Sequence, residues 1–200
     1  MKPERNPWDI RDPAPLGDRD ENAIFNAVGR ALTEWERVES ACARLFAVFV
    51  SANYRRAYHA PAVQAFGCVT SVKTKGDMLR LAATAYFQKR KTTQAAFQRQ
   101  LSQAVNEYVA YSNRRNDIAH GCVQSVFLTE RTIGSRRRTG GIGCYLVPSF
   151  FNPKKFKLDQ FTYRYTSSDL IHYTQEFTKL HLRINALRER MQSTRAKARV

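Results

Sequence analysis

Hydrophobic residues recur every three or four positions from about Asp20 to Asn53, and this period predicts one long helix with a single apolar stripe. A second helix is expected to begin at Pro61, because proline lacks only an N–H that the first turn of a helix leaves unpaired. The stripe of the first helix consists of Ile24, Val28, Ala31, Trp35, Val38, Cys42, Leu45 and Phe49.

The helical pattern continues as far as Gly121. A short helix is expected through Val72 and another over about 76–89, either as two helices or as one bent helix, since glycine weakens a helix without excluding it. Thr92 or Thr93 can cap the next helix, whose apolar pattern ends at Gly121, a residue type that often terminates helices.

Beyond Gly121 the pattern changes. Residues 123–165 are rich in Val, Phe and Tyr, with glycines and prolines between the runs, which is typical of two or three short strands. A final helical stripe then covers 168–192, with Thr and Ser residues before it that can cap its first turn. The sequence therefore predicts an all-α helical bundle with a small β-rich insertion before the last helix.

The length of 200 residues suits one folded domain, which we place at 21–192 with 123–165 as its basic insertion. Residues 193–200 form a basic tail that is expected to fray. Residues 1–20 have few apolar side chains and are predicted to form a flexible arm, because they contain Pro3, Pro7, Pro13 and Pro15.

The charge of the chain narrows the choice of partner. Lys and Arg number 33 against 17 Asp and Glu, which gives a formal net charge of +16. Such an excess favours a polyanionic partner, and RNA is the leading candidate, although a basic protein can also be basic without binding nucleic acid. The hydrophobic fraction of 43% argues against a disordered chain.

The cysteines and the N-terminus point to a reduced compartment. The four cysteines form no CxxC pair, so no zinc ribbon or redox motif is expected, and we predict neither a metal nor a cofactor. The first 20 residues alternate charge and proline where a secretion signal would need an apolar run, and no apolar segment is long enough to cross a membrane. The prediction is a soluble cytoplasmic protein that does not engage a membrane.

The stretch RRNDIAHG, residues 114–121, gathers two arginines, an amide and an imidazole at the predicted end of a helix. Asn116 and His120 are four positions apart and share a helix face, whereas Arg115 points about 140° away from His120 on a regular helix. Arg115 must therefore reach across a subunit interface, or the helix must loosen before His120.

Arg115, Asn116 and His120 resemble the R-polar-x3-H form of the Rx4-6H motif of the HEPN superfamily (higher eukaryotes and prokaryotes nucleotide-binding). In that family the motif lies at the end of a helix in an α-helical bundle, and one further helix closes the bundle. The helices expected over 21–121 and 168–192 fit this setting. The resemblance implies a metal-independent endoribonuclease that acts as a homodimer.

The chemistry of the residues agrees with that implication. Cleavage of RNA by its own 2′-hydroxyl needs a base, an acid and positive charge for the phosphorane, but the motif of one chain has a single histidine. A twofold axis that joins two copies would supply the second. We assign His120 to acid–base catalysis, Arg115 to phosphate binding and Asn116 to orienting the histidine or the scissile group, with Arg114 as a second phosphate contact.

An alternative interpretation is purely structural: Arg115 and Asp117 would make surface ion pairs, and Asn116, His120 and Gly121 would simply end the helix.

The insertion supplies further candidates for RNA binding. Residues 121–165 contain eight basic and two acidic side chains among many aromatic ones. Arginines and lysines could therefore bind phosphates while the rings stack on bases. Alternatively, some of the rings must be core, and the glycine-rich run could be only a flexible turn. The candidates are Arg136, Arg137, Arg138, Lys154 and Lys155.

By analogy with the family, the setting would be a toxin–antitoxin pair or antiviral defence, with an inhibitory antitoxin or a sensor protein as partner. The runner-up is a non-catalytic RNA- or nucleotide-binding module, and a third possibility is a helical protein-interaction scaffold.

Overall fold

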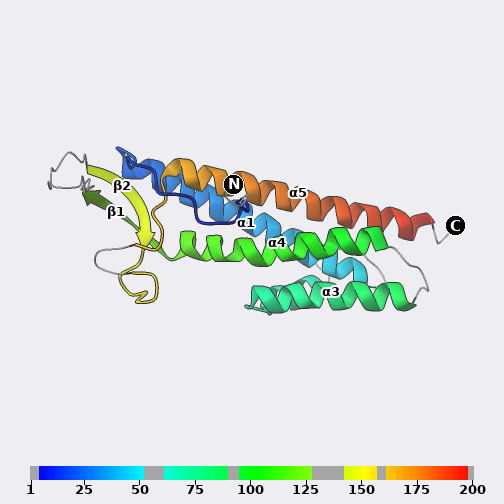
Figure 1. Cartoon of the computed structure of the whole chain (residues 1–200). Helices are drawn as coiled ribbons and strands as arrows, with labels where there is room; N and C mark the ends of the chain where they lie inside the picture. Colours follow the sequence, from blue (N-terminus) through cyan, green and yellow to red (C-terminus); the bar gives the residue numbers. More distant parts are fainter. Residues whose placement is uncertain (1–4, 52–60, 90–94, 128–141, 157–160, 198–200) are drawn as a thin grey trace. The chain divides into compact units, whose positions relative to one another are not determined.

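The computed structural model of the chain describes residues 5–51, 61–89, 95–127, 142–156 and 161–197. Within them the protein is mostly helical, with one small antiparallel sheet before the last helix, as the sequence predicts. The elements in chain order are α1 (Glu21–Val50), α2 (Pro61–Cys68), α3 (Val72–Lys89), α4 (Ala95–Ala119), β1 (Gly121–Phe127), β2 (Ile142–Pro148) and α5 (Ser167–Lys197) (Figure 1).

The helix boundaries refine the sequence predictions. The region after Pro61 forms two helices, because α2 ends at Cys68 and Ser71 caps α3 by accepting a hydrogen bond from the Thr74 N–H at 3.2 Å. α5 continues to Lys197 and so includes most of the tail that was expected to fray. The candidate caps Thr92 and Thr93 lie outside the described residues.

Two compact units make up the chain. The first unit contains Met1–Thr33 and Asn113–Glu176, and the second contains Glu34–Ser112 and Phe177–Val200. The boundaries between them fall inside α1, α4 and α5.

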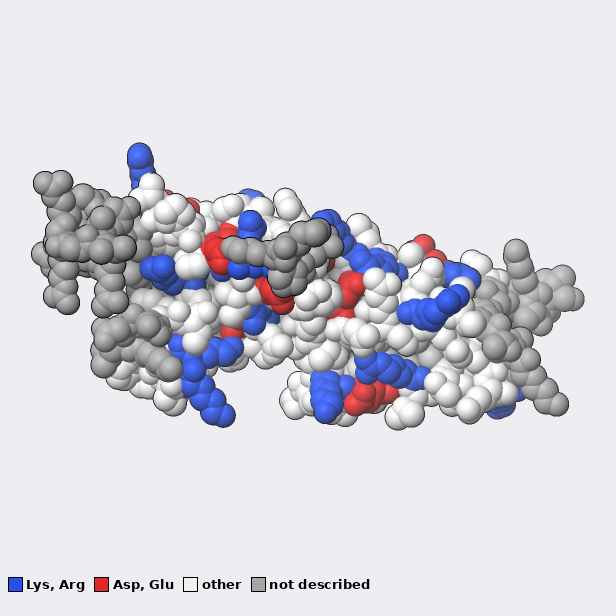
Figure 2. Space-filling model, viewed as in Figure 1, with Lys and Arg blue, Asp and Glu red and all other residues white. Residues whose placement is uncertain are grey.

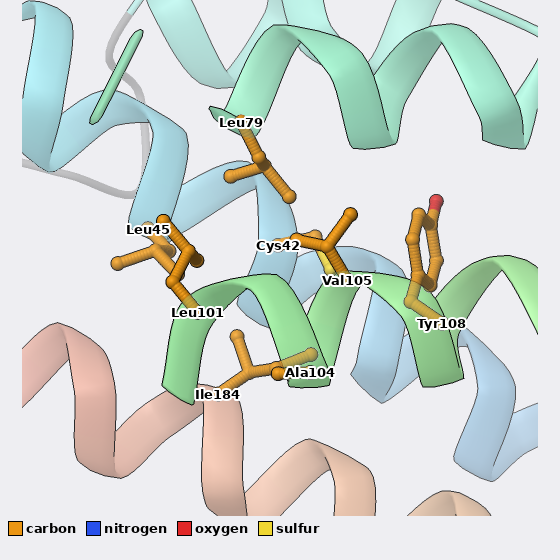
Figure 3. A pocket seen from close by; sticks show the side chains of 8 residues that line it. All are labelled: Cys42, Leu45, Leu79, Leu101, Ala104, Val105, Tyr108 and Ile184. Carbon is orange, nitrogen blue, oxygen red and sulfur yellow. The ribbon is translucent and has the colours of Figure 1, made fainter. Parts of the chain in front are cut away.

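The second unit has an apolar helical core. The Trp35 ring stacks on Tyr108 at 5.4 Å between centroids and meets the edge of Phe177 at 5.2 Å. Gly76 brings α3 close to α4, since a Cβ there would lie 3.0 Å from a Val105 methyl carbon. A further group of core side chains, drawn in Figure 3, leaves no space for a water molecule and consists of Cys42, Leu45, Leu79, Leu101, Ala104, Val105, Tyr108 and Ile184.

A largely buried polar cluster lies among the helices of the second unit. The Glu39 carboxylate accepts hydrogen bonds from the Lys75 ammonium and, at 2.7 Å, from the Tyr108 hydroxyl. Each of its oxygens therefore has a donor, which offsets the cost of burying the charge. Burial also raises the pKa of the neighbouring Cys42 thiol, so this cysteine is an inert part of the core.

The first unit is built around the sheet. β1 and β2 pair in an unbroken antiparallel register from Gly121 opposite Pro148 to Phe127 opposite Ile142. A third strand does not form among the described residues of the insertion, where Tyr165 makes only an isolated bridge to Leu146.

Described residues of the N-terminal segment, which was predicted to be a flexible arm, make several contacts within the first unit. Asp18 forms a bridge with Cys144 of β2, and its carboxylate accepts hydrogen bonds from the Ser167 N–H and hydroxyl, both at 2.7 Å. The Tyr173 hydroxyl donates to the carbonyl oxygen of Asp9 at 2.9 Å, so the N-terminal segment follows the beginning of α5 (Figure 1). These hydrogen bonds connect Asp9 and Asp18 to the first turns of α5.

Candidate functional site at the end of α4

The last turn of α4 carries the predicted catalytic residues. The His120 N–H donates to the carbonyl oxygen of Asn116 at 3.1 Å, so the helical hydrogen-bond pattern continues through His120. The side chains of both residues are exposed. The helix therefore does not loosen before His120, and the angle of about 140° between the directions of Arg115 and His120 remains.

The guanidinium of Arg115 has no carboxylate partner among the described residues. Its Nη1 donates to Asn116 Oδ1 at 3.2 Å, which holds the guanidinium beside the amide. Its Nε is buried without a hydrogen-bond partner, and no carboxylate of the described residues pairs with it. A guanidinium without a counter-charge is suited to bind an anion.

Arg114, the adjacent arginine, is mostly buried and contacts other side chains of the protein. Its side chain is only 11% exposed, and Nη2 lies 3.2 Å from Oδ2 of Asp117. Its Nη1 also donates to the Tyr165 hydroxyl at 3.2 Å. These contacts make Arg114 an anchor of the helix end and leave it poorly placed for the RNA contact predicted from the sequence.

Asp117 is the centre of that anchor. Its side chain is 1% exposed, and its carboxylate pairs with Arg114 and with the ammonium group of Lys155. The Tyr165 hydroxyl donates to Oδ2 at 3.2 Å, and the Tyr163 hydroxyl donates to the Asp117 carbonyl oxygen at 3.0 Å. The alternative interpretation, in which Arg115 and Asp117 make surface ion pairs, does not match this arrangement, because the ion pairs of Asp117 are formed by a buried carboxylate.

The two tyrosines are fixed as neutral hydrogen-bond donors. Burial raises the pKa of Tyr163, and the nearby Asp117 carboxylate raises it further. Burial likewise raises the pKa of Tyr165, with smaller contributions from Tyr173 and Asp117. Their rings stack at 4.8 Å between centroids. Some of the rings of residues 121–165 were expected to belong to the core, and Tyr163 and Tyr165 are two that are buried in the first unit.

The turn from helix to strand leaves no spare room at Gly121. A Cβ at this position would lie 2.8 Å from Leu146 Cγ and 3.0 Å from the Asp117 carbonyl oxygen. Glycine therefore lets β1 begin directly after His120, with β2 packed against the end of the helix.

The predicted RNA-binding residues have different environments. Lys154 is exposed, whereas Lys155 pairs with Asp117 and also lies over the Tyr163 ring. Arg136, Arg137 and Arg138 lie outside the described residues. The structure thus brings Arg114 and Lys155 together on one buried carboxylate and leaves Lys154 apart from it.

Charged side chains of both signs are scattered over the face shown in Figure 2. On the face shown in Figure 2, Lys and Arg side chains alternate with Asp and Glu and do not form one continuous basic surface. A site for a polyanion therefore depends on local groups, such as those at the end of α4, as well as on net charge.

The sequence reasoning missed Asp117, Tyr163 and Tyr165 as supports of the site. Tyr163 and Tyr165 alternate in the run FTYRY, a spacing that places both on one side of an extended segment. That alternation was the available signal, but their partner on α4 is 46 to 48 positions away in sequence.

Comparisons with family models, with curated proteins and with solved structures find no match to this chain. No described helix is long and apolar enough to cross a membrane. Within the described ranges, no group of three or more His, Cys, Asp or Glu side chains is arranged to hold a metal ion.

Proposed function

We propose that the protein is an endoribonuclease of the HEPN type, whose active site forms when two copies bring the ends of their α4 helices together. The observation that carries the proposal is the exposed His120, one turn after Asn116, whose amide oxygen accepts a hydrogen bond from Arg115, an arginine that no described carboxylate neutralises. The contacts of Asp117 also support the proposal, because they fix the last turn of α4 on the side opposite His120.

In the proposed reaction, His120 of one subunit removes the proton from a ribose 2′-hydroxyl, and the oxygen attacks the adjacent phosphorus. Arg115 stabilises the negative charge of the phosphorane with paired N–H donors. The partner's His120 gives its proton to the departing 5′-oxygen. The products are a 2′,3′-cyclic phosphate and a 5′-hydroxyl, so no external nucleophile or redox partner is consumed.

The regular helix bears on how the site is assembled. Because Arg115 and His120 of one chain point in different directions, one subunit cannot easily direct both at a single phosphate. Two copies related by a twofold axis can, since Arg115 of one can face His120 of the other. An inhibitory protein that covers this face would then control the activity, as in a toxin–antitoxin pair.

The test is cleavage of single-stranded RNA in EDTA by the wild type and by His120→Ala. We expect the variant to lose at least about 100-fold in rate, which is the usual contribution of one general acid or base. His181→Ala, a histidine of the second unit, is the matched control and should cleave at the wild-type rate.

Mixed dimers separate a shared site from two independent ones. Wild type and His120→Ala are refolded together in different proportions. If the site needs both histidines, the activity should be proportional to the square of the wild-type fraction, because only dimers of two wild-type subunits are active. A linear loss would contradict the composite site, and a strict monomer by light scattering would remove it. RNA binding without cleavage by the wild type would instead identify a non-catalytic binding module.

A further inference from the structure

A phenylalanine patch lies on the segment that follows β2. It consists of Phe150, Phe151, Phe156 and Phe161. In the order Phe151, Phe150, Phe156, Phe161, the rings form a chain with successive centroid distances of 5.6, 5.5 and 5.6 Å. Phe150 is 65% exposed and Phe151 is 89% exposed. Two adjacent phenylalanines that face solvent over a supporting layer of rings are unusual for a surface with no partner.

Backbone hydrogen bonds hold this segment in place. The Asn152 N–H donates to the Ser149 carbonyl oxygen at 2.9 Å, and the Phe156 N–H donates to the Asn152 carbonyl oxygen at 2.8 Å. The Phe151 N–H also reaches the Ser149 hydroxyl at 3.3 Å. The exposed rings are thus presented by an ordered turn, which reduces the entropy that a ligand would have to remove on binding.

The patch is tied to the end of α4 at two points. Pro148, two residues before Phe150, pairs with Gly121, the residue directly after His120. Farther along, Lys155 forms its ion pair with Asp117, one turn before His120. The segment that carries the rings therefore begins and ends against the turn that carries the proposed catalytic residues (Figure 1).

The charge beside the patch is positive. The stretch SFFNPKKF, residues 149–156, contains two lysines and no carboxylate. Lys154 is exposed, and no described carboxylate pairs with it, while the ammonium of Lys155 is already matched by Asp117. Exposed aromatic faces next to an unmatched cation suit a ligand that has both flat rings and negative charge.

We infer that the phenylalanine patch binds unpaired nucleobases of a single RNA strand, with Lys154 on the adjacent phosphate. This inference rests on the proposed function for the role of the bound strand, and it adds the substrate class: RNA whose bases are free to stack. In a duplex the base faces are covered by their neighbours, so the rings have nothing to contact. A second protein would have to leave Lys154 buried without a counter-charge or supply a carboxylate for it.

The test measures binding in the His120→Ala background, so that the probe stays intact. A labelled adenosine 12-mer is titrated by fluorescence anisotropy, alone and as a duplex with a uridine 12-mer. We expect the Phe150→Ala/Phe151→Ala double variant to bind the single strand at least about fivefold more weakly, because one base stacked on an aromatic ring contributes about 1–3 kcal/mol. The Phe150→Trp/Phe151→Trp variant should retain binding, because it keeps flat aromatic rings.

Leu182→Ala, which truncates another exposed apolar side chain, is the matched control and should bind as tightly as the parent. Lys154→Ala should lower the salt dependence of binding by about one unit of slope. Both phenylalanine side chains are exposed, so circular dichroism should show unchanged folding for their variants.

Several results would overturn the inference: equal affinity for single strand and duplex, no loss in the double alanine variant, or conversion of a dimer to a monomer by that variant, which would mark the patch as a subunit contact. The proposed nuclease fails by a different result, in which the wild type binds the single strand through the patch but leaves it uncut.

Discussion

The two sides of the last turn of α4 differ sharply although they are made of neighbouring residues. On the inner side, Asp117 is buried and pairs with Arg114 of the same helix and with Lys155 of the insertion, and the Tyr165 hydroxyl contacts both Arg114 and Asp117. On the outer side, Asn116 and His120 are exposed. The difference teaches that this turn has a buried anchor side and an exposed side that carries the proposed catalytic residues, and that charged residues one position apart can have different environments.

The largest expected effect comes from removing the centre of the anchor. Asp117→Ala leaves the guanidinium of Arg114 buried without its counter-charge, and breaking a buried pair in this way costs about 3–5 kcal/mol. Urea denaturation should show this loss of unfolding free energy. The matched control on the outer side is Asn116→Ala, which should change it by less than about 0.5 kcal/mol. Similar losses for the two variants would erase the distinction between the faces.

An intermediate effect is expected where the helix meets the sheet. Gly121→Ala places a methyl group within 3.0 Å of Leu146 and of the Asp117 backbone, so we expect a loss of about 1–3 kcal/mol in unfolding free energy. Gly29→Ala is the matched control, because nothing lies within 4 Å of its added Cβ and alanine favours a helix, which should raise stability by about 1 kcal/mol. A stabilised Gly121→Ala variant would show that the turn is not tightly packed.

The smallest effect should come from single hydroxyl groups of the anchor. Tyr163→Phe removes one hydrogen bond to the Asp117 carbonyl oxygen and should cost about 0.5–1.5 kcal/mol by urea denaturation. Phe161→Leu is the comparison variant. Because Phe161 has no hydroxyl, the change in unfolding free energy of this variant reports on ring packing alone.

These hydroxyl groups also predict how stability depends on pH. Burial raises the pKa of Tyr163 and Tyr165 above the ordinary tyrosine value of about 10, so the unfolded chain loses these protons first. Their contribution is complete below that value and is lost as pH rises toward the folded-state pKa. Tyr163→Phe should therefore show a shallower fall in stability above about pH 10 than the wild type. Identical slopes would argue that Tyr163 ionises as freely in the folded protein as in the unfolded chain.

The helical fold could be predicted from the sequence because its signals are local. The three-to-four residue period placed Trp35 and Phe177 in the core, and both are buried. The change of period after Gly121 located the sheet and the final helix. Each of these depends on neighbouring residues within one element, which is the information that hydrophobic periodicity carries.

The environment of the site could not be predicted in the same way. Arg114 and Arg115 are equivalent in a helical pattern, and only the buried Asp117 with its partners from the insertion distinguishes them. The same holds for the aromatic residues after β2: Tyr165 is buried and Phe151 is exposed, although both belong to one aromatic-rich stretch. Docking of the N-terminal segment through Asp18 is also a long-range contact. Local propensity contains no information about partners that are distant along the chain.

The register of the sheet has a consequence for how such a protein can diversify. Gly121 is locked opposite Pro148, so the spatial relation between His120 and Phe150 depends on that pairing and is independent of how many residues connect Phe127 to Ile142. A change in the number of residues between Phe127 and Ile142 would leave the pairing of Gly121 with Pro148 as it is. The register of the sheet therefore fixes how far the phenylalanine patch can lie from the proposed catalytic residues.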